Sequence, residues 1–337
     1  MSENTDKAQS GATSVRDLRA LPKAHLHLHT EGSMRPSTLL ELAEVYGIPA
    51  PEMGVYESFA AFDAIYGTAV NVLKTEADLR RLYDEIVDDA ADDGAVWVEP
   101  AFCPPMLPWL GESEHVLEIA IDALKSACQR RGIDGGFLLT INRADVGMAA
   151  GLADLAARYA GKGVVSFGLA NDENIVGPEP FAEAYKVAKD AGLLAAPHAG
   201  EMAGADSVRR HVEYLNADRL EHGVRGLEDP AVLEMILERD ICLDVCLTSN
   251  VLLSVVPNME EHPLPRLLDA GVSCSLNADD SLLFGPGLLD EYENARNAVK
   301  LDDVALAGIA AASIAHSGAP DSVKREAKVS IADWLTK

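Results

Sequence analysis

Residues 24–29 read Ala24-His25-Leu26-His27-Leu28-His29, a run in which histidine and leucine alternate. Alternation with a period of two is typical of a β-strand, because successive side chains of a strand point to opposite faces. The three histidines therefore share one face of the expected strand, and the two leucines share the other. Packing does not explain three imidazoles on one face, so this strand is the first candidate for a functional element.

Outward from this strand, short apolar runs that end in polar residues alternate with longer amphipathic segments. The short runs are Ala24–His29, Val96–Phe102, Phe137–Asn142, Val164–Leu169, Leu193–His198, Arg219–Gly223, Ile241–Leu247 and Val272–Asn277. The helical patterns are Leu79–Ala91, Val116–Arg131, Ala149–Ala160, Pro180–Ala191, Asp206–Leu215 and Pro230–Glu238. Strands that alternate with helices predict βαβ units and a parallel sheet. Eight such units predict an α/β fold closed into a (β/α)8 TIM barrel.

An open, doubly wound sheet is the alternative fold. It would also place ligands at the carboxyl ends of its strands, but usually with a glycine-rich phosphate turn, and no G-x-G-x-x-G follows any expected strand. In barrel enzymes the carboxyl ends of the strands carry the active site. The polar residues expected there are His27, His29, Glu99, Asn142, residues 171–173, His198, His222, Ser249, Asn250, Asp279 and Asp280.

The segment 46–72, between the first two strands, is longer than one connecting helix requires. It contains Met53, Phe59, Phe62 and Tyr66. One interpretation is an extra helix packed over the barrel, and the other is a set of lid helices that exclude water from the pocket. We expect a single domain over residues 16–337, preceded by a disordered tail over residues 1–15, which are polar.

The charge balance narrows the class of partner. The 337 residues include 28 basic and 54 acidic side chains, a net charge of −26, and this field repels nucleic acids and anionic membranes. A small-molecule substrate fits better. The five scattered cysteines predict buried, reduced thiols and a cytoplasmic location. No signal-peptide pattern or membrane-spanning apolar run is present in the sequence, and nothing in it indicates an oligomeric state.

Four of the strand-end residues form a candidate metal site. His27 and His29 lie nearest the carboxyl end of the first strand and suit two imidazole ligands on one divalent ion. His25 would lie one layer deeper, as a supporting residue. His198 closes the fifth run and offers a third nitrogen, while Asp279 follows the eighth run and offers an oxygen. Three nitrogens and one oxygen are a usual catalytic zinc set that leaves a position for water.

Two neighbouring features refine this site. Asp279 and Asp280 could instead form a solvated turn or a helix cap near Ser281, but the apolar run before them favours a ligand. Glu201 follows His198 by three residues, past a glycine that permits a sharp turn. A carboxyl group beside a metal that it does not bind is the usual position of a general acid or base.

A cysteine-based type of catalytic zinc site is excluded by its own motif. That type uses one histidine and paired cysteines in a P-C-x-x-C setting. Here Cys242 and Cys246 are four residues apart in a hydrophobic strand, and Cys103 precedes two prolines. We interpret all three as core residues.

Taken together, six stretches closely resemble the adenosine deaminase branch of the amidohydrolase superfamily, from about residue 18 to the C-terminus. The stretches are Lys23–Gly32, Gly168–Glu173, His198–Glu201, Glu221–Gly223, Thr248–Asn250 and Ser275–Asp280. The resemblance implies one zinc ion per chain, held by His27, His29, His198 and Asp279. It implies Glu201 as proton donor and His222 beside the attacking water. It further implies that Asp280 reads the purine, that the backbone near Asn171 contacts it, and that Glu31 lies near the ribose 5′ end.

The implied reaction is the hydrolytic deamination of a 6-aminopurine nucleoside, with adenosine or deoxyadenosine first, to inosine or deoxyinosine and ammonia. Adenine and 6-amino-6-deoxyfutalosine are alternative substrates. Two departures from the family bear on this choice: Asn171 stands where glycine is usual, and His25 stands where an acidic residue is common.

Two other functions stay open from the sequence. A binuclear hydrolase on the same barrel usually needs a carboxylated lysine after a middle strand, and residues 164–173 contain no lysine. A non-catalytic purine-binding homologue belongs to a different class of protein, although every expected catalytic residue is present.

Overall fold

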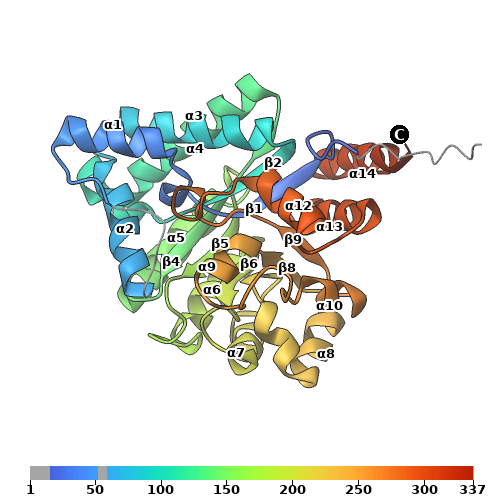
Figure 1. Ribbon diagram of the computed structural model, residues 1–337. Helices are drawn as coiled ribbons and strands as arrows, with labels where there is room; N and C mark the ends of the chain where they lie inside the picture. Colours follow the sequence, from blue (N-terminus) through green and yellow to red (C-terminus); the bar gives the residue numbers. More distant parts are fainter. Residues whose placement is uncertain (1–15, 52–58, 337) are drawn as a thin grey trace, which may run out of the picture.

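Eight parallel strands form a ring inside a layer of helices in the computed structural model, which describes residues 16–51 and 59–336 (Figure 1). The ring runs in the order β1 (Lys23–His29), β2 (Ala95–Phe102), β4 (Phe137–Asn142), β5 (Val164–Ala170), β6 (Leu194–Ala199), β7 (Arg219–His222), β8 (Cys242–Val245) and β9 (Cys274–Leu276). All eight predicted strands are present, and neighbouring strands pair in parallel. The predicted (β/α)8 TIM barrel is confirmed. A two-residue strand that was not predicted, β3 (Asp134–Gly135), pairs with β2.

The seam between β1 and the end of β9 closes the barrel. The backbone N–H of His29 donates to the carbonyl oxygen of Asp279 at 3.2 Å, and the N–H of Asp279 donates to that of His27 at 3.1 Å. Asn277 adds its side-chain oxygen, which accepts hydrogen bonds from the N–H groups of Leu26 and His27 at 2.7 and 3.1 Å. The seam therefore fixes the distance between the first strand's histidines and Asp279.

The six helices predicted between the strands are all present, with local signals at their ends. They are α3 (Glu76–Asp92), α4 (Ser113–Arg131), α5 (Ala149–Tyr159), α6 (Ala182–Asp190), α7 (Ala205–Leu215) and α8 (Pro230–Glu238). Thr75 and Asp78 form a reciprocal capping box at the start of α3, which satisfies N–H groups that the helix leaves free. Gly132, with φ of 70°, ends α4 in the left-handed conformation that glycine adopts without strain.

The later helices complete the outer layer. They are α9 (Leu247–Leu252), α10 (Leu264–Asp269), α11 (Ser281–Phe284), α12 (Leu288–Asn297), α13 (Asp303–Ala315) and α14 (Asp321–Thr336). In Figure 1, α3 and α4 cover the upper side of the strands, α7 and α8 cover the lower side, and α14 lies beside the C-terminus.

Two extra helices, α1 (Pro36–Tyr46) and α2 (Phe59–Val72), lie between β1 and α3. Phe62 and Tyr66 of α2 line the pocket at the carboxyl ends of the strands. The additional helices predicted between the first two strands are present, although only α2 lies within the segment 46–72, and its position agrees with a lid. Met53 and the side chain of Phe59, which the same prediction included, lie outside the described residues.

Glu99 does not lie where the sequence analysis placed it. The Glu99 carboxylate accepts hydrogen bonds from the Arg219 guanidinium at 2.9 Å and from the backbone N–H of Gly318 at 2.5 Å. Arg219 is the first residue of β7, so Glu99 belongs to the amino-terminal part of the barrel interior and not to the pocket. Asp244, whose carboxylate lies 3.0 Å from Arg219, completes this buried ion group.

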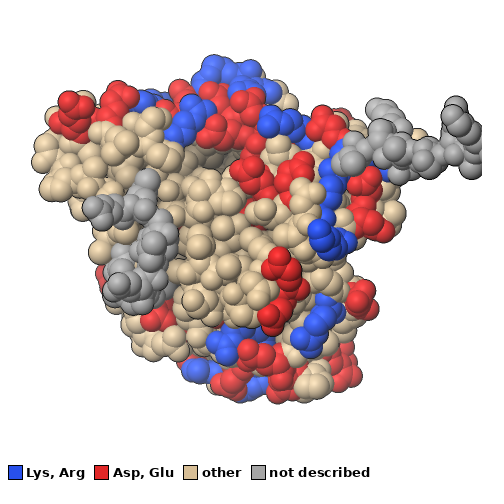
Figure 2. Space-filling model, in the orientation of Figure 1, with Lys and Arg blue, Asp and Glu red and all other residues tan. Residues whose placement is uncertain are grey.

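The cysteines agree with the sequence-based prediction. All five are buried and unpaired. The expected tail of residues 1–15 lies outside the described residues. Within the part of the chain that the structure describes, no helix combines the length and apolarity needed to cross a membrane. On the face shown in Figure 2, charged side chains gather along the top and the bottom, and acidic side chains also lie near the centre.

Candidate active site

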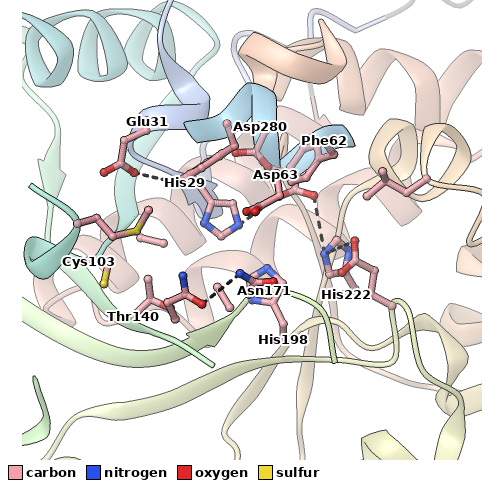
Figure 3. A pocket seen from close by; sticks show the side chains of 18 residues that line it. His29, Glu31, Phe62, Asp63, Cys103, Thr140, Asn171, His198, His222 and Asp280 are labelled. Carbon is pink, nitrogen blue, oxygen red and sulfur yellow. Dashed lines mark hydrogen bonds and ion pairs between the residues drawn. The ribbon is translucent and has the colours of Figure 1, made fainter. Parts of the chain in front are cut away.

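A pocket opens at the carboxyl ends of the strands, and all nine predicted site residues except His27 line it. It contains about 730 Å³ of space free of atoms, including its opening to solvent. The lining residues are His29, Glu31, Phe62, Asp63, Tyr66, Ala101, Cys103, Met106, Thr140, Asn142, Ala170, Asn171, His198, Glu201, His222, Leu253, Asp279 and Asp280. Figure 3 shows Glu31 and Asp280 on one side of this pocket, and Asn171 and His198 on the opposite side.

The four predicted metal ligands meet at the deep end of the pocket. His27, His29, His198 and Asp279 each place one ligand atom within 4.8 Å of the others'. Asp279 Oδ1 lies 3.3 Å from His27 Nε2 and 3.4 Å from His29 Nε2. His27 Nε2 is buried and has no hydrogen-bond partner among the described residues. An unpartnered buried nitrogen beside a carboxylate and two more imidazoles fits a divalent cation of the zinc type.

Buried oxygens orient two of these imidazoles. The carbonyl oxygen of Asp244 lies 3.1 Å from His27 Nδ1, and Glu221 Oε2 lies 2.7 Å from His198 Nδ1. Each contact places the proton on Nδ1 and leaves Nε2 free to bind a metal, as outer-shell partners of zinc histidines usually do. Burial opposes the charge of Glu221, but the neighbouring His198 and His27 lower the pKa of its carboxyl to about 2. Sequence reasoning quoted Glu221 in a motif but gave it no role.

His25, the deepest of the three alternating histidines, lies below the metal ligands. Its Nε2 accepts a hydrogen bond from the backbone N–H of Ala278 at 3.1 Å. Burial, and then the neighbouring His27, lower the pKa of His25 to about 3, so the ring is neutral and able to accept. His25 therefore holds the chain just before Asp279, which agrees with its predicted supporting position.

Glu201 lies beside the metal ligands and is buried. Its Oε1 is 3.4 Å from His222 Nε2. Burial, followed by the negative charges of Asp279 and Glu173, raises the pKa of the Glu201 carboxyl well above its usual value. A carboxyl group that stays protonated near neutral pH can donate a proton to a bound substrate.

A chain of hydrogen bonds sets the tautomer of His222. The backbone N–H of Leu264 donates to His262 Nδ1 at 3.1 Å, so His262 carries its proton on Nε2 and donates to Asn250 Oδ1 at 3.2 Å. The Asn250 amide then donates to His222 Nδ1 at 3.1 Å. The proton of His222 is therefore on Nε2, which points toward Glu201 and Asp279. His262 carried no signal in the sequence, because it is one residue in an irregular segment.

Asp280 follows Asp279, one of the four predicted ligands, and its Oδ1 is buried and unpartnered within the described chain. Burial raises the pKa of its carboxyl well above the usual value, which makes it a hydrogen-bond donor. It occupies the N-cap position of α11 but makes no side-chain cap. Gly32 makes room for it, since a Cβ atom at residue 32 would lie 1.6 Å from Asp280 Oδ1.

Glu31 and Tyr66 meet beneath the lid helix. The Tyr66 hydroxyl donates to Glu31 Oε2 at 2.8 Å, while Glu31 Oε1 is buried without a partner in the described residues. Burial raises the pKa of the Glu31 carboxyl, although the Tyr66 hydrogen bond opposes this. Glu31 therefore presents one free oxygen to whatever enters the pocket.

Three non-glycine residues of the pocket hold left-handed backbone: Asn171 with φ of 84°, His222 with 70° and Asp279 with 59°. Such conformations cost about 1–3 kcal/mol each and gather at functional sites. Asn171 also fixes its side chain: its amide nitrogen donates to Asn142 Oδ1 at 3.1 Å, and its oxygen accepts from the N–H of Asp172 at 2.7 Å. Both amides line the pocket, and Figure 3 shows Asn171 on the side opposite Asp280.

Comparison with known proteins agrees with this geometry. A model of the family described as adenosine deaminase matches residues 22–334. The chain belongs to the adenosine deaminase family. It is therefore a deaminase of the metal-dependent amidohydrolase type. A Streptomyces coelicolor family member, provisionally named an adenosine/adenine deaminase, is 42% identical to it over 95% of this chain and 98% of its own length.

Two further proteins are less similar to this chain in sequence. An adenine deaminase of Sinorhizobium medicae is 32% identical, over 84% of this chain and 90% of its own length. The crystal structure of an adenine deaminase from Arthrobacter aurescens superposes with a TM-score of 0.86 at 27% identity, over 94% of this chain and 99% of that one.

Proposed function

We propose that this chain is a zinc-dependent hydrolase that deaminates a neutral 6-aminopurine, with adenosine or deoxyadenosine as the first candidate substrate and one zinc ion per chain. The observation that supports it best is the cluster of three imidazoles and one carboxylate beside a protonated Glu201. Adenine is the second candidate, because the relatives described above include enzymes named adenine deaminases.

In this reaction the chain's own residues donate a proton to the purine and orient the attacking water. A zinc ion held by His27, His29, His198 and Asp279 would supply a water molecule of lowered pKa as the nucleophile. Glu201 donates its proton to N1 of the purine, which makes C6 electrophilic. His222 directs its Nε2–H toward the attacking oxygen and orients it. The attacking water loses both of its protons: one passes to the amino group, which leaves C6 as ammonia, and the other restores the Glu201 carboxyl. The proton that Glu201 donated stays on N1 of the 6-oxo purine.

The same placement assigns the rest of the purine. With N1 at Glu201, the protonated Asp280 donates to N7 on the other side of C6. The N3 edge then faces Asn171, whose backbone and amide lie at the pocket edge. The free oxygen of Glu31 accepts a hydrogen bond from a sugar hydroxyl near the N9 substituent, or from N9–H of the free base.

The substrate is tested by the loss of the adenine ultraviolet band and the release of ammonia. Adenosine, deoxyadenosine, adenine, 6-amino-6-deoxyfutalosine and AMP are compared. We expect turnover of adenosine or deoxyadenosine, and a kcat/KM for AMP that is at least ~10-fold lower, because burying a phosphate group without a cationic partner costs free energy. The described lining contains no lysine or arginine that could pair with a phosphate group.

Two measurements separate the alternatives. A zinc content of one ion per chain agrees with the proposal, whereas two ions would indicate a binuclear hydrolase. If none of the purines releases ammonia from zinc-loaded protein, the proposal fails and a purine-binding homologue remains. Efficient turnover of AMP would show that the pocket lining does not discriminate against a substrate that carries a phosphate group.

Replacing Asn171 with glycine tests the contact at the N3 edge. We expect KM to rise by about fivefold, which corresponds to the ~1 kcal/mol of one hydrogen bond. The melting temperature should change little, because glycine adopts a φ of 84° without strain, and this gain offsets the loss of the two side-chain hydrogen bonds of Asn171. Steady-state kinetics and thermal unfolding measure both effects. An unchanged KM would mean that the Asn171 side chain does not contact the substrate.

A further inference from the structure

Glu173 lies in the loop after β5, and its carboxylate is buried beneath the turn that carries Glu201. The carboxylate binds three backbone N–H groups of that turn. Its Oε1 accepts from Gly200 at 2.8 Å, and its Oε2 accepts from Glu201 at 2.8 Å and from Ala203 at 3.2 Å. A fourth contact, from the Ser207 hydroxyl to Oε1 at 2.6 Å, ties the group to helix α7.

The surroundings keep this carboxylate charged and in place. Burial opposes ionisation, but the Ser207 hydrogen bond and the nearby His211 and Arg143 together lower the pKa of Glu173 below its usual value. Arg143 also donates to the carbonyl oxygen of His198 at 2.9 Å, so it supports the strand from which the turn begins. An ionised carboxylate accepts stronger hydrogen bonds than a neutral group does.

The turn needs such support because its backbone is unusual. Gly200 has φ of 70°, and a Cβ atom there would lie 2.5 Å from a methyl group of Val208. The N–H groups of Gly200, Glu201 and Ala203 all point to one side and share the Glu173 carboxylate. Without that acceptor the three N–H groups would be left in a buried region with no partner, and the turn would move to find others.

We propose that Glu173 is the positioning residue of the general acid: its carboxylate clamps the turn 200–203 and holds the Glu201 carboxyl where it meets the substrate. Glu173 itself does not contact substrate. This inference rests on the proposed function, in which Glu201 donates the proton. It goes further because it makes the efficiency of that step depend on a residue 28 positions earlier in the chain.

The variant Glu173→Gln tests the clamp without changing side-chain size. Both oxygens of the Glu173 carboxylate accept hydrogen bonds from backbone N–H groups. In either orientation, the glutamine amide replaces one of these oxygens with an NH₂ group, which cannot accept and faces another donor. We expect kcat to fall by about 10–100-fold, since a displacement of about 1 Å can cost a catalytic group that much. KM should stay within about threefold, and the zinc content should stay at the wild-type value. The amide hydrogens of residues 200–203 should exchange faster with deuterium.

Two control variants separate the clamp from general effects. Ser207→Ala removes the one contact outside the turn and leaves the three backbone contacts, so kcat should stay within about threefold of wild type. Glu179→Gln removes a glutamate from the same loop, where it pairs with Arg210 at 2.6 Å near the surface, and activity should not change. If Glu173→Gln does not fold, Glu173→Asp keeps the charge but not the reach, and the same drop in kcat at constant KM is expected of it.

The outcomes are decisive for each claim. Inactive wild-type protein would contradict the proposed function and not the clamp, which the exchange measurement still tests. An active wild type with a Glu173→Gln variant of normal kcat overturns the clamp. A loss of kcat that follows a loss of zinc also overturns it, because Glu173 would then act through the metal ligand His198.

Discussion

Glu201→Gln is expected to lower kcat by ~10²–10⁴-fold, the usual contribution of a placed general acid. Glutamine keeps the size of the side chain but has no proton of the required acidity for N1 of the purine. Glutamine fits the buried position of Glu201 without rearrangement, and its side-chain oxygen can keep the 3.4 Å contact with His222. Steady-state kinetics with the preferred purine measure the loss.

Two accompanying results identify the loss as a missing proton. The zinc content of Glu201→Gln, measured by atomic absorption, should equal that of wild type, because residue 201 is not a ligand. In wild type, kcat should fall as the pH rises through the raised pKa of Glu201, because only the protonated carboxyl donates. This alkaline decline should be absent in the variant. Normal activity in Glu201→Gln would disprove the assignment of the acid.

His198→Ala should abolish both zinc binding and activity. His198 supplies the third nitrogen of the cluster, and Glu221 holds it at 2.7 Å through Nδ1. Removal of an outer-shell partner alone weakens metal binding by about 10–100-fold, so removal of a ligand is expected to exceed ~100-fold. Atomic absorption on the purified variant should therefore find little zinc, and no purine should be deaminated.

The matched control is His115→Ala, which removes an exposed imidazole from α4, outside the pocket. It should keep the wild-type zinc content and turnover. Full zinc content in His198→Ala would contradict the ligand assignment. Loss of zinc from both variants would indicate that the preparation, and not residue 198, is responsible.

Local sequence patterns predicted most of the barrel. The alternation in residues 24–29 identified β1 and placed its three histidines on one face, and the regular spacing of strands and helices identified the closed parallel sheet. These signals are readable because a strand's period and a helix's period depend only on neighbouring residues. Two of the four proposed ligands followed for the same reason, since the His27 and His29 pair on one strand needs no knowledge of the rest of the chain. His198 and Asp279 lie in other runs and were proposed only in combination with that pair.

Glu99 shows where this reasoning fails. The sequence placed it at the strand ends, but it pairs with Arg219 in the amino-terminal part of the barrel. In a barrel the strands are tilted and staggered, so the height of a residue depends on the register between strands. Register depends on how segments distant in sequence pair with each other, so it cannot be predicted from one run of residues.

The sequence by itself determined that this protein is a parallel barrel with three imidazoles and an aspartate at its strand ends, because each of those features is local. The tertiary structure alone decided how they are held. The seam that joins His29 to Asp279, the carboxylate of Glu221 on His198 and the carboxylate of Glu173 under Glu201 all connect segments that are separate in sequence. Such contacts form only when the closed barrel brings the ends of its strands together, and they set which imidazole nitrogens face the cluster and where the Glu201 carboxyl lies.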